Sequence, residues 1–271
     1  MGTPSARHYQ GDFVAWTGGC AFIGGGNGAL APHAHYAIQL VIGAPQGLRV
    51  QFGHRGPWHA CASALIPSRA VHSIDVTDCR WVAVIFIEPE TPQGKILSSR
   101  LASGPELLDG DALAVATSRL YRAWNTEKNP DAVKAMCQAV VREISQTAQR
   151  EPSDPRVLAA VEFIRQRVNQ PVTLAEVARA AHLSPSRFRH LFVEETGMPL
   201  RTYVLWRRLF HVWVLLMQGE TLSMAAHAAG FADSAHLSRT SRAMFGTPPS
   251  ALQMNGPLTR AARQSAPGHS G

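Results

Sequence analysis

Three histidines and one glutamine in the N-terminal third of the chain have the types and spacing of a ligand-binding cluster. His33 and His35 are two residues apart, so on a β-strand both side chains point to the same face. Gln39 follows four residues after His35, and His72 comes after the proline turn of "LIPSRAVHSI". Imidazole suits several divalent transition metals, whereas a neutral amide is a weaker ligand than a carboxylate. The cluster predicts a divalent metal site, a pocket whose histidines bind a small effector by hydrogen bonds, or a barrel that serves only as a scaffold.

A second group of residues, in the last third of the chain, forms an internal repeat. The segments "TLAEVARAAHLS" and "TLSMAAHAAGFA" each predict a short helix that ends in a tight turn. The turns fall at His182 and Gly230, residue types that tolerate positive φ. A second helix then begins after a capping residue, Ser184 or Asp233. Two such helix-turn-helix units, joined by a helix from Pro199 to about Gln218, are typical of proteins that place the second helix in the DNA major groove.

The positive charge of the chain is concentrated in the same region. Between Pro155 and Met254 there are eleven arginines and six acidic residues, which gives +5 of the chain's net charge of +7. Arginine's planar fork suits both phosphate oxygens and the guanine edge. The charge distribution therefore favours a nucleic-acid partner for the helical region.

The repeat resembles the DNA-binding module of the AraC/XylS-type bacterial transcription regulators. The match rests on "TLAEVARAAHLSPSRFRHLFVEETGMPLRTYV" and "TLSMAAHAAGFADSAHLSRTSRAMFGTPPSAL", including the Gly-Phe corner and the Phe-Gly-x-x-Pro ending. The resemblance implies that both recognition helices of one monomer read successive major grooves on one face of double-stranded DNA.

Individual roles follow from the positions in this motif. The resemblance implies base reading by Ser186, Arg189, His190, Ser234, Ala235, His236 and Arg239. It implies phosphate contacts, which position the protein without reading sequence, for Thr173, Arg187, Thr221, Ser238 and Arg242. For each of these residues the alternative is a solvated helix face.

The N-terminal histidine pattern is similar to the metal-binding motif of cupin barrels, and to the cupin-like sensing domain that precedes this module in many members of the family. Gln39 stands where metal-binding cupins usually have glutamate, and the glycine context of the second motif is thin. The resemblance implies an unidentified small-molecule effector, a homodimer, and RNA polymerase as a partner if the protein is an activator. No membrane partner, cofactor or catalytic activity is expected. The alternative is a cupin-type metal-dependent enzyme or sensor whose DNA-binding module is secondary.

The remaining patterns predict an α+β fold with a β-barrel followed by an all-α domain. Residues 1–93 form the β domain, in which Ala37–Ile42 and Trp81–Ile87 are strands. Residues 94–150 are helical, including Leu107 and Leu108, and end in a linker at 149–156. An apolar stripe from Val133 to Ile144 could pack on the β domain or on a partner subunit. Residues 155–255 form the DNA-binding domain, and 256–271 are expected to be a disordered tail.

Cysteine usage and the terminal sequence indicate a cytoplasmic protein. The four cysteines lie far apart and form no C-x-x-C motif, so we expect small buried thiols in a reducing compartment. Residues 1–10 lack the basic-then-apolar order of a signal peptide. The longest apolar runs are far too short to span a bilayer.

Ser241 interrupts the apolar stripe of the last recognition helix. Leu237, Met244 and Phe245 define that stripe, and the related regulators usually have phenylalanine at position 241. We therefore expect a cavity at this position, unless Trp206 or Trp213 fills the space. On this hypothesis Ser241→Phe raises the melting temperature of the isolated C-terminal module.

Overall fold

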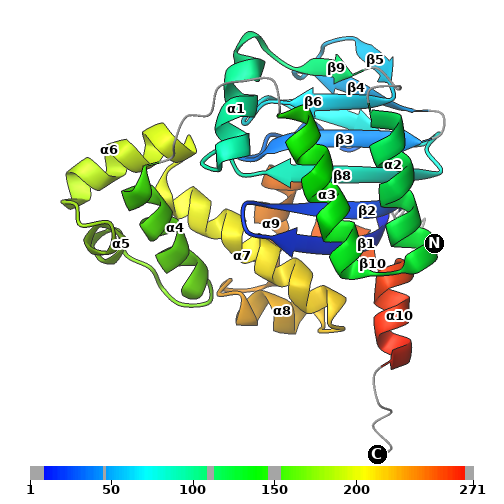
Figure 1. The fold of residues 1–271 in the computed structure, drawn as a ribbon. Coiled ribbons are helices and arrows are strands. Elements are labelled where there is room, and N and C mark those ends of the chain that lie inside the picture. The colour runs from blue at the N-terminus through cyan, green and yellow to red at the C-terminus, as the bar shows by residue number, and fades with distance from the viewer. Residues whose placement is uncertain (1–8, 45–46, 109–112, 146–153, 266–271) are drawn as a thin grey trace, which may run out of the picture.

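The computed structural model describes residues 9–44, 47–108, 113–145 and 154–265. A sheet-rich N-terminal part carries helices on one face, and a helical C-terminal part packs against the other side (Figure 1). The last strand and helix of the chain return to the N-terminal sheet (Figure 1). The two parts therefore share one continuous apolar core.

Two sheets form the N-terminal domain. The larger has the strand order β10-β1-β2-β8-β3-β6-β9, and the smaller has the order β5-β4-β7. Antiparallel pairing is the rule, with Val41 opposite Val84 where β3 meets β8. The first eight strands are β1 Tyr9–Trp16, β2 Gly19–Gly26, β3 Ile38–Ala44, β4 Leu48–Phe52, β5 Trp58–Cys61, β6 Ser63–Ile66, β7 His72–Asp75 and β8 Trp81–Ile87.

Alternation along the strands separates two apolar layers. In β8, Trp81, Ala83 and Ile85 face the covering helices, whereas Val82 and Phe86 face the opposite side. The covering helices are α1 Pro92–Arg100, α2 Ala114–Tyr121, a π-helical turn Arg122–Glu127, and α3 Pro130–Ile144. The stripe from Val133 to Ile144 is buried against this sheet, so it packs within the chain and not on a partner subunit.

The segment around Leu107 differs from the sequence-based expectation. Residues Glu106–Leu108 form strand β9, which pairs with β6 at the edge of the larger sheet, instead of a helix. Pairing with β6 gives the backbone groups of these three residues hydrogen-bond partners. These hydrogen bonds outweigh the helix propensity of so short a segment.

The C-terminal part contains two helix-turn-helix units around a central helix. The first unit consists of α5 Leu174–Ala180 and α6 Pro185–Thr196, and it follows α4 Pro155–Gln166. The central helix α7 spans Leu200–Met217 and begins and ends within a residue of the predicted bounds. The second unit consists of α8 Leu222–Ala228 and α9 Ser234–Phe245. The predicted linker lies partly outside the described residues, and Asp154 caps α4 directly after that gap.

Residues 256–265 are ordered, which corrects this part of the expected disordered tail; the rest of that tail lies outside the described residues. After the 3₁₀ turn Pro249–Ala251, strand β10 Leu252–Met254 pairs in parallel with β1. Helix α10 Pro257–Ser265 follows, and the buried Asp12 carboxylate accepts hydrogen bonds from the backbone N–H groups of Leu258 and Thr259 at 3.0 and 2.8 Å. A buried carboxylate at a helix N-terminus satisfies donors that have no intrahelical partner. Asp12 is distant in sequence, so local patterns did not predict this helix.

Two further expectations concern cysteines and membrane segments. All four cysteines are free. Cys20, Cys79 and Cys137 are buried, as predicted, whereas Cys61 is half-buried. Within the described ranges, no helix combines the length and the apolar character needed to cross a bilayer.

Candidate functional site

The first helix-turn-helix unit has the caps and the turn that its sequence predicts. Thr173 and Glu176 form a reciprocal capping box at the start of α5. His182 adopts a positive φ of 54° in the turn. The Ser184 hydroxyl then accepts a hydrogen bond from the backbone N–H of Arg187 at the start of α6. These local interactions hold the two helices at a fixed angle.

The second unit repeats this construction with different residues. The Thr221 hydroxyl accepts from the backbone N–H of Met224. Gly230 has φ of 78°, and Asp233 caps α9 by accepting from the backbone N–H of His236 at 2.6 Å. Gly246 ends α9 in the left-handed conformation, with φ of 69°. The internal repeat read from the sequence is therefore a structural repeat.

The predicted base-reading side chains point away from the core. They are exposed except for His236, which is half-buried because its ring packs on Phe231 at 5.2 Å between centroids. The exposed members are Ser186, Arg189, His190, Ser234, Ala235 and Arg239. The faces of α6 and α9 that carry these residues are thus open to solvent.

The predicted phosphate contacts divide into two groups. Arg187 and Arg242 are exposed on the recognition helices, and Ser238 is partly exposed beside them. Thr173 and Thr221 are exposed helix caps. The backbone N–H of Thr173 already donates to the Glu176 carboxylate at 2.9 Å, so a phosphate at this helix end would have to displace an anion.

Two arginines that add to the basic charge of the module point inward. Arg207 forms an ion pair with Glu88, at the end of the N-terminal sheet. Arg208 donates to the carbonyl oxygens of Val168, Gly230 and Gln170. It therefore links the turn of the second unit to the segment between α4 and α5. Sequence reasoning missed both roles, because a charge count does not distinguish an exposed arginine from one that pairs within the protein.

A buried polar cluster joins the two domains. Glu90 accepts hydrogen bonds from Tyr36 of the N-terminal domain and from Tyr203 of α7, the latter at 2.9 Å. Burial, together with the negative charge of Glu88, raises the pKa of Glu90 to about 7. Lys95 on α1 and Glu195 on α6 form a second interdomain ion pair at 2.7 Å. The first helix-turn-helix unit and the central helix α7 are therefore docked on the N-terminal domain.

Aromatic side chains form the apolar part of the same interface. Phe245 of α9 packs against Phe22 and Phe86 of the sheet, with centroid distances of 6.1 and 5.5 Å. Trp213 packs on Phe22 at 5.4 Å, and Trp206 stacks on Phe245 at 5.5 Å. The C-terminal end of the second recognition helix is thus part of the core of the N-terminal domain.

Ser241 has a function in this packing that the sequence pattern did not reveal. It is fully buried, and its hydroxyl donates to the Thr247 carbonyl oxygen at 2.8 Å. The serine therefore ties α9 to the turn that follows it. The sequence pattern predicted missing apolar volume at this position and did not predict this hydrogen bond.

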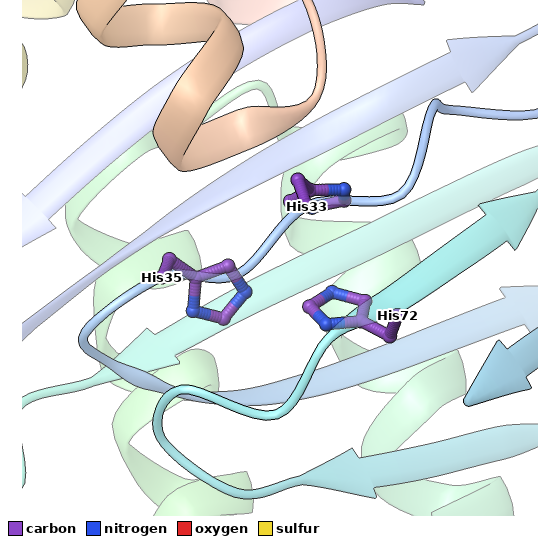
Figure 2. A group of neighbouring side chains, drawn as sticks. All are labelled: His33, His35 and His72. Atoms are coloured by element: carbon purple, nitrogen blue, oxygen red, sulfur yellow. The ribbon is translucent and has the colours of Figure 1, made fainter. Parts of the chain in front are cut away.

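The N-terminal histidines converge as predicted (Figure 2). One ring nitrogen from each of His33, His35 and His72 lies within 4.8 Å of the others, and all three residues are buried. The first two come from the irregular segment before β3 and not from a regular strand, and His33 pairs with His72 in an isolated β-bridge. The bridge brings together residues that are far apart in the chain.

Backbone hydrogen bonds fix which nitrogen of each histidine ring carries the proton. The Nδ1 atoms of His33, His35 and His72 lie 2.8 Å from the carbonyl oxygens of Ala31, Ala37 and Ala70, in that order. A carbonyl oxygen only accepts, so each Nδ1 carries the proton and each Nε2 keeps its lone pair. Burial lowers the pKa of all three imidazoles, that of His35 to about 3, so they are neutral near pH 7.

Gln39 and a small cavity complete this cluster. The Gln39 Oε1 atom lies 2.5 Å from the Nε2 atom of His35. A cavity of about 50 Å³ borders His33 and Gln39, and Phe245 and Thr247 from the C-terminal domain are part of its lining. The cluster of four predicted residues therefore lies directly beneath the end of α9.

Comparison with known proteins agrees with this architecture. Residues 177–255 match the helix-turn-helix domain family. The probable transcriptional regulator LumQ from Photobacterium leiognathi is 29% identical over 92 residues, which make up 34% of this chain and 37% of LumQ. The match thus spans little more than a third of that relative's length.

Similarity to solved structures extends over both domains. The apo form of a ToxT variant from Vibrio cholerae superimposes with a TM-score of 0.58 at 10% identity, over 88% of this chain and 97% of ToxT. Wild-type ToxT bound to an unsaturated fatty acid gives 0.54 at 12% identity, over 87% and 94%. The chain therefore contains a match to the helix-turn-helix domain family over residues 177–255, and its sheet-rich and helical parts have the arrangement of the ToxT fold.

Proposed function

We propose that the chain is a sequence-specific, DNA-binding transcription regulator that presents α6 and α9 to successive major grooves. The observation that carries this proposal is the pair of capped recognition helices with exposed arginines, Arg189 and Arg239, in their first halves. Arginine in the major groove pairs with the O6 and N7 atoms of guanine. The matched family and the LumQ relative support the same function.

The N-terminal domain would control how the two reading helices are placed. Both units dock on it through Lys95–Glu195, Arg207–Glu88 and the aromatic contacts of Phe245. A ligand that binds the docked form more tightly than the released form shifts the population toward the docked form. We propose that an effector bound in the N-terminal domain regulates DNA binding in this way.

The size of the cavity beside the histidine cluster limits which effector could bind at that place in the docked form. ToxT is known with a bound unsaturated fatty acid. The cavity beside His33 and Gln39 measures about 50 Å³, while pockets for organic ligands usually have about 300–1,000 Å³. An acyl chain would therefore require Phe245 to withdraw, whereas an ion or a water molecule fits without that movement.

Assembly and activation are parts of the same proposal. Homodimerisation would use a surface other than the apolar stripe of α3, since that stripe is buried within the chain. An activating role would add a contact with RNA polymerase.

A metal-dependent enzyme is the second candidate, because three neutral imidazoles are a known catalytic zinc set. Against it, the bordering cavity, which Phe245 helps to line, measures only about 50 Å³ and leaves little room for an organic substrate. We therefore favour a regulatory role for the histidine cluster over catalysis.

In vitro selection tests the proposed function. The full chain is used to enrich duplexes from a random DNA library, which are then sequenced. We expect two short preferred blocks whose centres are about 10 base pairs apart, one for each recognition helix. Recovery of unenriched random sequence, or of a single block, would contradict reading by both helices.

A further inference from the structure

A groove lies between the two helix-turn-helix units, away from the histidine cluster. Residues of α6, of the central helix α7, of the segment around the start of α5 and of the first turn of α9 line it, and its volume is about 540 Å³. Pockets for organic ligands usually have about 300–1,000 Å³. We propose that this groove binds a small organic carboxylate with an apolar body, and that the bound carboxylate competes with DNA. The competition rests on the proposed function, whereas the binding does not.

Most of the lining of the groove is apolar. Phe188 and Phe192 of α6 line it and are themselves buried, with ring centroids 5.0 Å apart. Val172, before α5, and Leu205, on α7, are half-buried lining residues. Covering apolar surface that is in contact with water is favourable. The groove therefore favours a ligand whose body is a hydrocarbon or an aromatic ring.

The ionisable side chains of the groove favour an anion. Among the described residues, the lining contains Arg189, Arg201, Arg208 and His236, and no aspartate or glutamate. Arg189 and Arg201 are exposed, and neither forms an ion pair within the described ranges. The planar fork of arginine matches a carboxylate group in two parallel hydrogen bonds. Apolar walls beside unpaired guanidinium groups thus fit a ligand that combines a carboxylate with an apolar body.

Arg208 is a half-buried cation that has no anionic partner in the described part of the chain. Its guanidinium donates to the neutral carbonyl oxygens of Val168, Gly230 and Gln170, at 3.1, 2.6 and 3.1 Å. Burial lowers the pKa of Arg208. A guanidinium has five N–H donors, so two remain beyond these three hydrogen bonds. A carboxylate in the groove would provide the counter-charge that this buried cation lacks.

Arg189 connects the groove to the DNA-reading surface. The side chain that lines the groove is also the α6 candidate for a guanine contact, and His236 of α9 lies in the same lining. A carboxylate bound to Arg189 makes that guanidinium unavailable to a base. It also places a negative charge between the two recognition helices, where DNA phosphates approach. The ligand and the duplex should therefore weaken each other's binding by the same factor.

Isothermal titration calorimetry of the full chain without DNA tests the binding. The probe is biphenylcarboxylate; its neutral amide has the same body without the charge, and acetate has the charge without the body. We expect saturable binding of the carboxylate with a Kd at or below about 1 mM, and at least about tenfold weaker binding of the amide and of acetate. No measurable binding, or equal affinities for the carboxylate and the amide, would overturn the proposal.

Matched arginine variants locate the site. Arg201→Gln should weaken the binding of biphenylcarboxylate roughly tenfold, because one charged hydrogen-bond donor is lost. Arg179→Gln, on α5 and exposed but not part of the lining, is the control and should bind as the wild type does. Unchanged affinity in Arg201→Gln would contradict the assignment to this groove. A dimer in sedimentation that no longer binds the probe would show that a second copy covers the groove, and would also overturn the proposal.

Fluorescence anisotropy with a labelled duplex from the selection tests the competition. At biphenylcarboxylate about ninefold above its Kd, the apparent Kd for the duplex should rise about tenfold, while acetate at the same concentration should leave it unchanged. Calorimetric binding without this rise would overturn the competition. A chain that binds the carboxylate but no DNA would support the ligand site and contradict the proposed function, so the two failures are distinguishable.

Discussion

At the scale of single residues, the arginines of the helical domain have different roles. Arg189, Arg239 and Arg242 are exposed on the recognition helices, whereas Arg207 and Arg208 form interactions within the protein. The charge available for DNA is therefore smaller than the sequence count suggests. The residue composition predicted a nucleic-acid partner. Only the fold shows which arginines are exposed and which form interactions within the protein.

Arg242 provides a test of the phosphate role. A side chain that contacts phosphate contributes equally to the binding of every DNA sequence. Arg242→Ala should therefore weaken binding to specific and to random duplexes by the same factor. The slope of log K against log salt should fall by about 1. Fluorescence anisotropy at several salt concentrations measures both quantities. Arg119→Ala, on the exposed face of α2, is the control and should change neither. A loss confined to the selected sequence would assign Arg242 to base reading instead.

Ser241 makes a buried hydrogen bond that the sequence pattern did not predict. Ser241→Ala leaves the buried Thr247 carbonyl oxygen without this donor, and the full chain should lose about 1–2 kcal/mol of unfolding free energy. Ser241→Phe should also be destabilising, by about 1–3 kcal/mol, because the site is fully buried. Urea denaturation measures both, with Ser238→Ala on the same helix as the control. A more stable phenylalanine variant would restore the original cavity hypothesis.

At the scale of elements, the end of α9 couples the recognition helix to the histidine cluster. Gly246 ends this helix, and a Cβ atom there would lie 2.6 Å from the Ala31 carbonyl oxygen and 2.7 Å from His33 Nδ1. Gly197 ends α6 in the same left-handed conformation, but a Cβ atom there would meet only Arg69, at 3.9 Å. The two helices thus have equivalent caps in different surroundings.

This pair of glycines provides a matched comparison. Gly197→Ala should cost about 1–2 kcal/mol, because alanine is strained at positive φ. Gly246→Ala should cost at least about 1 kcal/mol more, since the new methyl group also collides with the N-terminal domain. Chemical denaturation of both full-length variants measures the difference. Equal costs would show that α9 does not dock as described.

At the scale of the whole molecule, the domain interface is sensitive to pH. Glu90 has a pKa of about 7 in the folded protein, against an ordinary value of 4.5, because it is buried near Glu88. Between these two values the folded state holds a proton that the unfolded state has released. The free energy of unfolding therefore falls as the pH rises through this window.

Glu90→Gln removes this titration. Between pH 5 and pH 8, the free energy of unfolding of the wild type should fall by up to about 2–3 kcal/mol relative to that of the variant. Urea denaturation at several pH values measures this difference, and the substitution changes neither partner of the Arg207–Glu88 ion pair. Parallel pH profiles for the two proteins would contradict the raised pKa of Glu90.

The sequence predicted what is encoded locally. Caps at Ser184 and Asp233, the turns at His182 and Gly230, and strand β8 follow from residue type and spacing, and the structure confirms them. The convergence of the histidines was also predicted, although the β-bridge that produces it was not.

Features that depend on distant partners were not predicted. Strand β10 forms because β1 offers an unpaired edge, and α10 is capped by Asp12 from the opposite end of the chain. The docking of Phe245 into the N-terminal domain likewise joins segments without a local pattern. Periodicity and capping rules concern neighbours in sequence, so they do not report such contacts.

The central claim is that the two recognition helices read two separate blocks of DNA. The most direct measurement is the base preference of wild type, Arg189→Ala and Arg239→Ala in parallel selections with the full chain. Each variant should lose about 1–3 kcal/mol of binding free energy on the preferred site, and its base preference should weaken at one position only. The two positions should lie in blocks about 10 base pairs apart. Relaxation of the same block by both variants, or equal losses on random DNA, would contradict reading by two helices.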